Sequence, residues 1–543
     1  MSTTLHCDVL IAGGGVGGVA AAHRMSRYGL KVILTEETTW IGAQLTSQAV
    51  PPDEHGWLES FGCTAAHRDF RNRVRQYVRD HYPVRPEFRE DPFLNPGNGW
   101  VSPLCHEPTT AHAVLCEMLE PYRKTGRLDI RTGTRVREVT REGKHLRSAI
   151  LENLEDGSAT EVRFRYVLDA TENGDLLPLS DTSHVTGSEA RAMTGEPAAG
   201  DTHRPDNLQA FSWCFVVEHH GGRDHVIPEP ESYPYWRDYI PKLQPPWPGK
   251  LLSWTTPNPR TLETQTYRFD PHREEMGFLS GLWSFRRILD RSLYQPGAFA
   301  SDRCLVNWPM IDYLDGHLLS PDSAARERHL RGARELSRSL LYWLQTEAPR
   351  PDGGSGWPGL RPCPESTGTP DGFAMAPYIR ESRRIRALAT ITEDTVSAAL
   401  RPGETYGARW EDSVGIGYYR IDLHPSTGGD NYVDVLSLPF QIPLRSLVPV
   451  ETENLLPAAK NIGTTHITNG CYRLHPVEWN IGESAAALAA FCLRENLRPR
   501  EVAQNPRKRQ SFQKHLAKTG VELDWPDNLN LDHSDPHRHA MTE

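Results

Sequence analysis

The first 35 residues alternate between apolar runs and a glycine-rich turn. Residues 7–12, CDVLIA, form a short apolar run that is typical of a buried parallel strand. The turn GGGVGG follows at 13–18, and an alanine-rich stretch predicts a helix over 19–28. Gly29 ends that helix, and residues 30–35, LKVILT, predict a second strand. The pattern therefore predicts a β-α-β unit at the start of the chain.

Further apolar segments predict a helix over 110–125 and strands at 128–131, 134–140, 149–153 and 161–168. The stretch from 195 to 440 is rich in Trp, Tyr and Pro, with long polar connections. Within it, residues 378–390, YIRESRRIRALAT, predict a basic helix that leads into a strand. Its arginines are either solvated or paired with nearby acids, or one of them faces an anionic substrate or cofactor phosphate. Near the C-terminus the pattern predicts a strand at 453–462, a turn at 463–466 and a helix over 483–493.

Composition narrows the class of protein. A length of 543 residues predicts two or more domains, and the net charge of −10 gives no general reason to bind nucleic acid or an anionic membrane. No apolar run is long enough for a membrane span, and no signal peptide is recognisable at the N-terminus. Nine cysteines are scattered without a CxxC pair, so we expect a reduced, cytoplasmic protein without a metal site.

The glycine turn has the spacing of a dinucleotide-binding motif. Gly13 permits a tight turn, Gly15 lets the backbone approach a pyrophosphate, and Gly18 allows the helix to pack closely on the strand. Val16 lies in the same turn as a further candidate contact, and the helix that follows offers free N–H groups to phosphate. Glu36 and Glu37 end the second strand at the spacing of a ribose-binding carboxylate.

Later segments favour FAD over NAD by their resemblance to FAD-dependent oxidoreductases. TTWIGAQLTS at 38–47 resembles the segment that passes the flavin, with Ala43 in place of a usual glycine, and DATENGD at 169–175 resembles an internal FAD motif. The resemblance implies that backbone groups near Val136 contact adenine, that Asn461 contacts the ribityl chain and that a helix N-terminus faces the flavin ring. The cofactor contacts implied by these segments are Gly42, Gln44, Leu45, Val136, Ala170, Thr171, Gly174, Asp175, Asn461, Asn480, Ile481 and Gly482.

The motifs GGGxGG, WIGxQLT, DATExGDLLPL, YIRESRR and KNIGTTHxxNGxxRLHPVEWNIGE together resemble a bacterial family of FAD-dependent oxidoreductases, over residues 8 to about 494. The resemblance implies an α/β fold: a Rossmann-like FAD-binding domain, with a parallel sheet, helices on both of its faces and a β-meander, plus an inserted α+β substrate or cap domain. The expected boundaries are 1–194 and 441–500 for the FAD domain, 195–440 for the cap and 501–543 for a partly mobile extension. Within that tail, 532–539 is expected to be mobile rather than metal-binding.

Candidate chemistry gathers in the last motif. His466, Arg473, His475 and Glu478 lie within thirteen residues. His475 is the candidate base and Arg473 the candidate group for a substrate carboxylate or anionic flavin, whereas the alternative is that all four satisfy buried backbone groups. We expect an enzyme that oxidises a small polar metabolite by hydride transfer to flavin N5, as a monomer or homodimer. The alternatives are a flavin monooxygenase and, with less support, a lyase with structural FAD.

Overall fold

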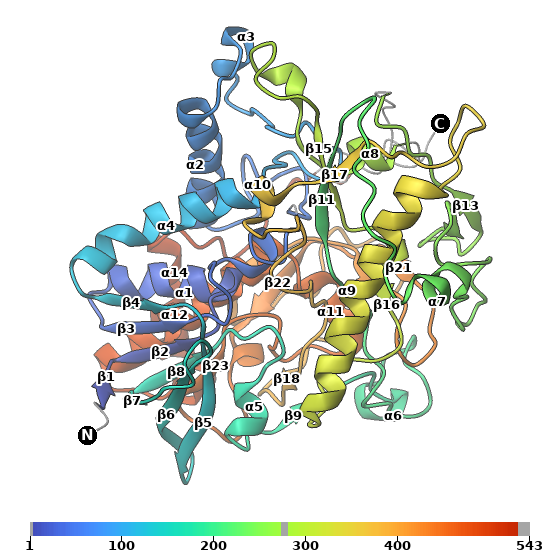
Figure 1. Cartoon of the computed structure of the whole chain (residues 1–543). Coiled ribbons are helices and arrows are strands. Elements are labelled where there is room, and N and C mark those ends of the chain that lie inside the picture. Colours follow the sequence, from blue (N-terminus) through green and yellow to red (C-terminus); the bar gives the residue numbers. More distant parts are fainter. Residues whose placement is uncertain (1–3, 51, 273–280, 530, 532–543) are drawn as a thin grey trace.

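The computed structural model of the chain describes residues 4–50, 52–272, 281–529 and 531, and Figure 1 shows their arrangement. Its centre is a sheet of five parallel strands in the order β23-β8-β2-β3-β4. These strands are β2 (Val9–Ala12), β3 (Val32–Thr35), β4 (Leu128–Arg131), β8 (Tyr166–Asp169) and β23 (Leu455–Pro457). The C-terminal third thus supplies the edge strand of the N-terminal sheet.

The two faces of this sheet have different covers. Val9, Ile11 and Leu34 point to a core shared with the helices, and Leu10 and Ile33 point to a second core shared with a β-meander. The helices are α1 (Val16–Arg27), α2 (Ala65–His81), α4 (Pro108–Lys124), α12 (His475–Glu495), α13 (Pro499–Gln504) and α14 (Pro506–Lys518). The meander consists of β5 (Thr134–Glu142), β6 (His145–Asn153) and β7 (Ala159–Arg163), with β1 (Leu5–His6) beside β7. The predicted Rossmann-like α/β class is confirmed, and the second face carries the meander where helices were also expected.

The predicted strand at 161–168 is two strands in two sheets. Its first half alternates buried Val162 with exposed Arg163, as a half-solvated antiparallel strand does. Its second half, β8, is buried at every position, as a central parallel strand is. The change from alternating to continuous burial marks the crossing from the meander to the central sheet.

The middle of the chain builds a separate core around an antiparallel sheet in the order β14-β15-β11-β17 and the long helix α9 (Ser323–Thr346). The strands are β11 (Phe215–His219), β14 (Arg287–Leu289), β15 (Arg303–Val306) and β17 (Leu360–Pro362). Smaller pairs join β10 (Phe211–Ser212) to β16 (Asp312–Tyr313), β12 (Thr255–Pro257) to β13 (Thr264–Thr266), β19 (Ser413–Gly417) to β22 (Phe440–Pro443), and β20 (Ile421–Leu423) to β21 (Val433–Val435). Short helices are α3 (Pro86–Arg89), α5 (Leu176–Leu179), α6 (Arg191–Thr194), α7 (Tyr233–Asp238), α8 (Leu282–Phe285) and α10 (Pro364–Thr367).

The predicted basic helix at 378–390 is wrong. This segment is extended, and its one regular element is β18 (Arg384–Ile385), which pairs with β9 (His184–Val185). Arg380 and Arg384 are buried, so their side chains are not solvated. Both form ion pairs with carboxylates, which was the other alternative. An extended chain lets neighbouring residues face opposite sides, which a helix would not.

The C-terminal helix begins earlier than predicted. It starts at His475 and not at 483, with Pro476 in its first turn, where a missing N–H costs nothing. A further helix, α11 (His466–Tyr472), begins at the last residue of the expected turn, with a capping box at Thr465, and covers a stretch for which no helix was predicted. These two starts decide which backbone N–H groups are free near the cofactor.

The division into domains stays a prediction. Ile391, Val414 and Ile421 pack in the same core as α1 and α12, although they precede the expected boundary at 441. Phe512 and Leu516 of α14 also belong to that core. The tail that was expected to be mobile, from residue 532 onward, lies outside the described residues. Within the described ranges, every helix is too short or too polar to span a bilayer.

Candidate functional site

A cavity of about 340 Å³ lies at the carboxyl ends of the central strands. Its wall comes from the glycine turn, the end of β3, the start of β5, the loop after β8, and segments of the middle region. The lining residues that had been predicted to bind the cofactor are Gly13, Gly15, Glu36, Glu37, Val136, Ala170, Thr171 and Asp175. Ligands of doubly wound folds bind at this edge of the sheet.

The glycine turn packs closely on the protein's own backbone and leaves the N-terminus of α1 uncapped. A Cβ atom on Gly13 would lie 2.3 Å from the carbonyl oxygen of Ala170, and the residue has φ of +94°. A Cβ on Gly18 would lie 2.0 Å from the carbonyl oxygen of Gly13, which fits close packing of helix on strand. Gly15 is the N-cap of α1, and no side chain caps that helix end. The first amides of α1 are thus available to a phosphate, as FAD requires.

Glu36 closes the other end of the turn. Its Oε2 atom accepts a hydrogen bond from the Gly14 N–H at 3.0 Å, and Oε1 accepts from the N–H and hydroxyl of Thr38 at 2.9 and 2.8 Å. Burial raises the pKa of Glu36 to about 7, although these donors act to lower it. The carboxylate has further lone pairs for ribose hydroxyls.

A chain of buried polar groups leads away from the cavity. Glu172 lines it, and its Oε2 accepts from Lys460 Nζ at 2.5 Å. Lys460 is also 3.8 Å from Glu478, whose Oε2 accepts from Gln44 Nε2 at 2.5 Å. Burial raises the pKa of Glu478 above its usual value, even though Lys460 opposes the shift. Glu478 is therefore an ion-pair residue in the first turn of α12.

Arg473 stands beside this chain at the end of α11. It is buried, and it donates to the hydroxyl of Tyr378 at 2.6 Å and to Asp422 Oδ2 at 3.0 Å. Tyr378 lies between Pro377 and Ile379, which both line the cavity. Neither Arg473 nor Tyr378 lines the cavity itself, so the pair is linked to the wall only through the neighbours of Tyr378 in the chain.

His475 does not have the environment of a general base. It is fully buried, and burial lowers its pKa to about 3. Its Nδ1 accepts from the backbone N–H of Asp53 at 3.2 Å, so in the neutral ring Nε2 carries the proton. No described residue accepts from that Nε2 atom. His475 is placed to hold the loop at Asp53, which itself pairs with Arg286 at 3.4 Å.

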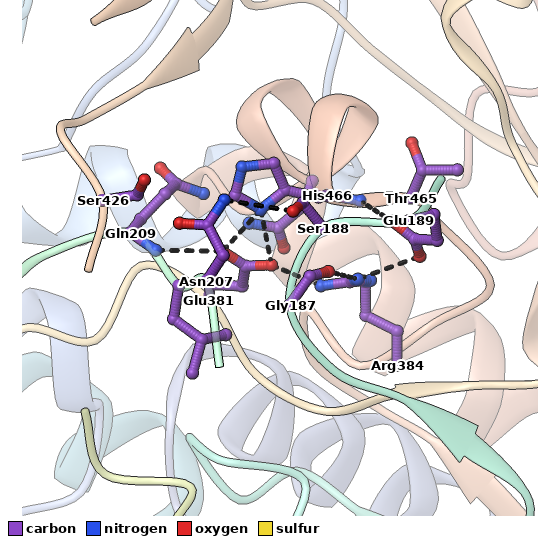
Figure 2. Close-up of polar contacts among 12 residues, drawn as sticks. Gly187, Ser188, Glu189, Asn207, Gln209, Glu381, Arg384, Ser426, Thr465 and His466 are labelled. Carbon is purple, nitrogen blue, oxygen red and sulfur yellow. Dashed lines mark hydrogen bonds and ion pairs between the residues drawn. The ribbon is translucent and has the colours of Figure 1, made fainter. Parts of the chain in front are cut away.

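His466 lies apart from the other three candidates. Its Nδ1 contacts both oxygens of Glu381, at 2.9 and 3.0 Å, and it lines a different cavity. Figure 2 shows Glu381 between His466 and Arg384, with Glu189 on the far side of the arginine. The four candidates of the C-terminal motif are thus divided between two places, Arg473, His475 and Glu478 in one and His466 in the other.

Three predicted flavin contacts have structural partners instead. Gly482 lies in the second turn of α12, where its N–H belongs to the helix, and a Cβ there would lie 2.0 Å from the Gly17 carbonyl oxygen. Asn480 donates to the carbonyl of Val414, and Asn461 donates to the carbonyl of Asp169. The predicted helix start at 483 had placed Asn480 and Gly482 just before the first turn, whereas both lie inside α12. The free amides of α12 belong to its first turn.

The other predicted contacts lie behind the wall. Gly42, Leu45 and Ile481 do not line the cavity, and the latter two are buried in the first core. Gly42 has φ of +109° and makes the turn before Ala43, which does line the cavity. Val16, Gly18, Gln44 and Gly174 also lie outside the lining.

Thr38 and Ser47 line the cavity within the segment that was predicted to pass the flavin, and Arg135 lines it beside Val136. The lining residues that the sequence analysis did not single out as contacts are Thr35, Gln48, Thr134, Leu154, Leu176, Trp213, Leu318, Leu330, Met375, Ala376, Pro377 and Ile379. Glu172 was visible only as a departure from the usual Thr-Gly motif. The motif YIRESRR was a usable signal for the lining residues at 375–379, because these residues lead into the motif and overlap its start.

A family model described as "FAD dependent oxidoreductase" matches residues 8–516. No curated protein matches the chain. Among solved structures, a geranylgeranyl bacteriochlorophyll reductase-like protein from Thermoplasma acidophilum is similar at 11% identity and a TM-score of 0.32, over 96% of this chain and 85% of that one.

Two further matches cover only part of each chain. L-proline dehydrogenase from P. horikoshii matches at 17% identity, TM-score 0.17, over 34% of this chain and 24% of that one. The flavin-dependent monooxygenase PieE, in complex with FAD and substrate, matches at 13% identity and a TM-score of 0.24, over 40% of this chain and 35% of that one. The family match spans nearly the whole chain and includes the turn, the cavity and the C-terminal motif: the chain belongs to the FAD dependent oxidoreductase family.

Proposed function

We propose that this FAD-dependent enzyme oxidises a small polar metabolite by two electrons. The observation that supports the proposal is the buried Arg473–Tyr378 pair, whose tyrosine lies in the sequence between two residues that line the cofactor cavity, Pro377 and Ile379. A buried arginine with a fixed phenol suits a substrate that carries negative charge or develops it. Bound FAD supplies the hydride acceptor, N5 of its ring.

The residues that line the cavity are of the types that bind FAD. We propose that the first turn of α1 and Gly15 hold the pyrophosphate, and that Glu36 holds the ribose of the adenosine. Val136 lines the same cavity, and we propose that its backbone contacts the adenine. Gln48 also lines the cavity. The roles of Gly13, Ala170, Thr171 and Asp175 are supported by their place in the lining.

The residues around Arg473 have distinct tasks in this proposal. Arg473 orients the substrate through a charged hydrogen bond and is itself fixed by Asp422. Tyr378 is a hydrogen-bonding partner, and burial raises its pKa above the ordinary value, so the phenol keeps its proton. His475 is a positioning residue for the Asp53 loop, in place of the base that the sequence indicated.

The test is a visible spectrum of the purified protein, followed by anaerobic titration with candidate metabolites. We expect flavin absorbance that a substrate bleaches without NAD(P)H. Bleaching by NAD(P)H alone would favour the second candidate, a monooxygenase. One observation speaks for the first: the described ranges contain one five-stranded parallel sheet and no second sheet of this kind for a nicotinamide dinucleotide.

FAD affinity should depend on pH through Glu36. With a pKa of about 7, this carboxyl is protonated below pH 7 and then accepts fewer hydrogen bonds from a ribose. The dissociation constant should rise by up to about tenfold per pH unit as pH falls from 7. Fluorescence titration of apoprotein with FAD at several pH values measures it. Glu36→Gln should bind FAD more weakly and lose this pH dependence; an equal slope in that variant would assign the effect elsewhere.

Arg473→Met should slow flavin bleaching by substrate by about 100-fold, because a preorganised charged donor is lost. The rate is measured by anaerobic stopped-flow absorbance on protein matched for FAD content. Arg147→Met is the control, since Arg147 is exposed on β6 and pairs only with the exposed Glu142. An unchanged bleaching rate in Arg473→Met would remove Arg473 from the substrate site.

A further inference from the structure

The second cavity, which we call the histidine cavity, has a volume of about 350 Å³. None of its lining residues lines the cofactor cavity. Its polar wall includes Glu189, Glu196, Arg204, His424, Asp430 and His466. Its volume is within the range of small-molecule sites, which begins at about 300 Å³.

His466 presents a hydrogen-bond donor to this space. Burial acts to lower its pKa, but contact with the Glu381 carboxylate raises it above the ordinary value. Glu381 is fully buried, and His466 and Arg384 hold its pKa at about 2. Contact with the carboxylate thus favours the charged imidazole, with Nδ1–H directed at Glu381. No described residue accepts from Nε2–H.

His424 is built in the same way on another side of the cavity. Its Nδ1 is 2.7 Å from Oδ2 of Asp312, a buried carboxylate. Its Nε2 is 3.9 Å from Asp422 Oδ2, beyond hydrogen-bond distance. Two imidazoles, each oriented by a carboxylate behind it, thus face one cavity.

The motif YIRESRR organises both histidines. Arg380 pairs with Asp312 at 3.2 Å and Arg384 pairs with Glu381 at 2.5 Å, so each backing carboxylate keeps a second cation. Ile379 of the same segment lines the cofactor cavity. The extended segment thus borders the cofactor cavity and also supplies the cations that pair with the carboxylates behind both histidines.

The carboxylates of the wall already have partners. Glu189 accepts from the Arg384 side chain and from the backbone N–H of His466. Asp430 accepts from Arg204, and Glu196 accepts from the Thr465 hydroxyl. Among the described lining residues, the Nε2 atoms of the two histidines have no hydrogen-bond acceptor, and the hydroxyl of Tyr432 has no partner either. The rest of the lining includes apolar side chains, namely Ala198, Ala199, Pro245, Leu262, Leu423, Val433 and Ile467.

We propose that the histidine cavity binds a small monocarboxylic acid with an apolar body. Its carboxylate accepts from His466 Nε2, with His424 beside it, and its hydrocarbon part lies against the apolar wall. The three wall carboxylates disfavour a phosphate dianion by like-charge repulsion. The site is independent of the proposed oxidation, since it requires neither flavin reduction nor Arg473.

Calorimetric titration of the FAD-loaded protein tests the site, with hexanoate as the probe. We expect hexanoate to bind at millimolar concentration or below, and hexan-1-ol, hexylammonium and inorganic phosphate to bind at least about tenfold more weakly, as the loss of a charged hydrogen bond predicts. Because no redox step is measured, a failure here leaves the proposed oxidation untouched, and a failure of flavin bleaching leaves this site untouched.

His466→Gln and His424→Gln should each weaken hexanoate binding by about tenfold or more. Both variants leave the backing carboxylate with its arginine, so we expect a folded protein with unchanged FAD content and melting temperature. His220→Gln is the matched control: His220 also pairs with a carboxylate, Glu218, but lies outside the cavity. Equal binding of hexanol, undiminished binding in both cavity variants, or no binding to the wild type would overturn the proposal.

Discussion

Replacing Gly15 by valine should give a folded protein that no longer retains FAD. Gly15 has φ of −65° and ψ of −171°, an extended conformation that valine adopts without strain. Its Cβ would point to Glu172 Oε1 at 2.7 Å, at the cavity wall beside the uncapped end of α1. The side chain would occupy the space of the pyrophosphate, so we expect FAD affinity to fall by about 1000-fold or more, since the helix amides no longer reach it.

The measurement is the ratio of flavin to protein absorbance after gel filtration, together with the melting temperature of the apoprotein. Gly221→Val is the control, because Gly221 is exposed and its Cβ would lie 4.0 Å from the nearest atom, His272 Cε1. Stoichiometric FAD in Gly15→Val would contradict the assignment of the turn. Loss of FAD in Gly221→Val as well would point to a general weakness of valine substitutions.

Gly482→Ala should destabilise the whole protein, with or without FAD. A Cβ on Gly482 would lie 2.0 Å from the Gly17 carbonyl oxygen, and one on Gly17 would lie 1.8 Å from the Ala458 carbonyl oxygen. Because both neighbours are backbone, neither rotates away, and α12 must move off α1. The buried pair Arg24–Glu483, at 3.2 Å, would be disturbed at the same crossing. We expect a loss of about 3 kcal/mol or more in the free energy of unfolding.

Denaturant unfolding of apoprotein and FAD-loaded protein measures this loss, with Gly221→Ala as the control in open space. The two forms separate packing from cofactor binding. A stable Gly482→Ala apoprotein that fails to hold FAD would restore Gly482 as a flavin contact. Equal destabilisation of both forms would assign it to the helix crossing.

The start of the fold was predictable because its signals are local. The run 7–12, the turn 13–18 and the acids at 36–37 lie within one β-α-β unit, where glycine spacing alone imposes the geometry. Glu36 and Gly15 line the cavity for that reason. The match of the whole chain to the family confirms FAD as the cofactor.

Other features depend on long-range contacts that a local pattern does not contain. The arginines at 380 and 384 looked like one face of a helix, but carboxylates from distant segments, Asp312 and Glu189, hold them in an extended chain. His466 and Arg473 are near in sequence, yet α11 places them at opposite ends and toward different surroundings. The local sequence around His475 suggested a base, because it does not show how deeply the side chain is buried. That burial is set by tertiary packing, and it lowers the pKa of His475 so that the ring is uncharged.

The Gly17–Gly482 crossing also affects the order in which the protein matures. During synthesis the N-terminal strand, turn and first helix leave the ribosome long before α12 and the edge strand β23 exist. Until then α1 lacks the helix against which it packs, and a nascent chain has an incomplete sheet at its cofactor edge. We therefore expect FAD to be captured late, once α12 has packed on α1, and chains truncated before residue 475 to be clients of chaperones and proteases that the cofactor does not rescue.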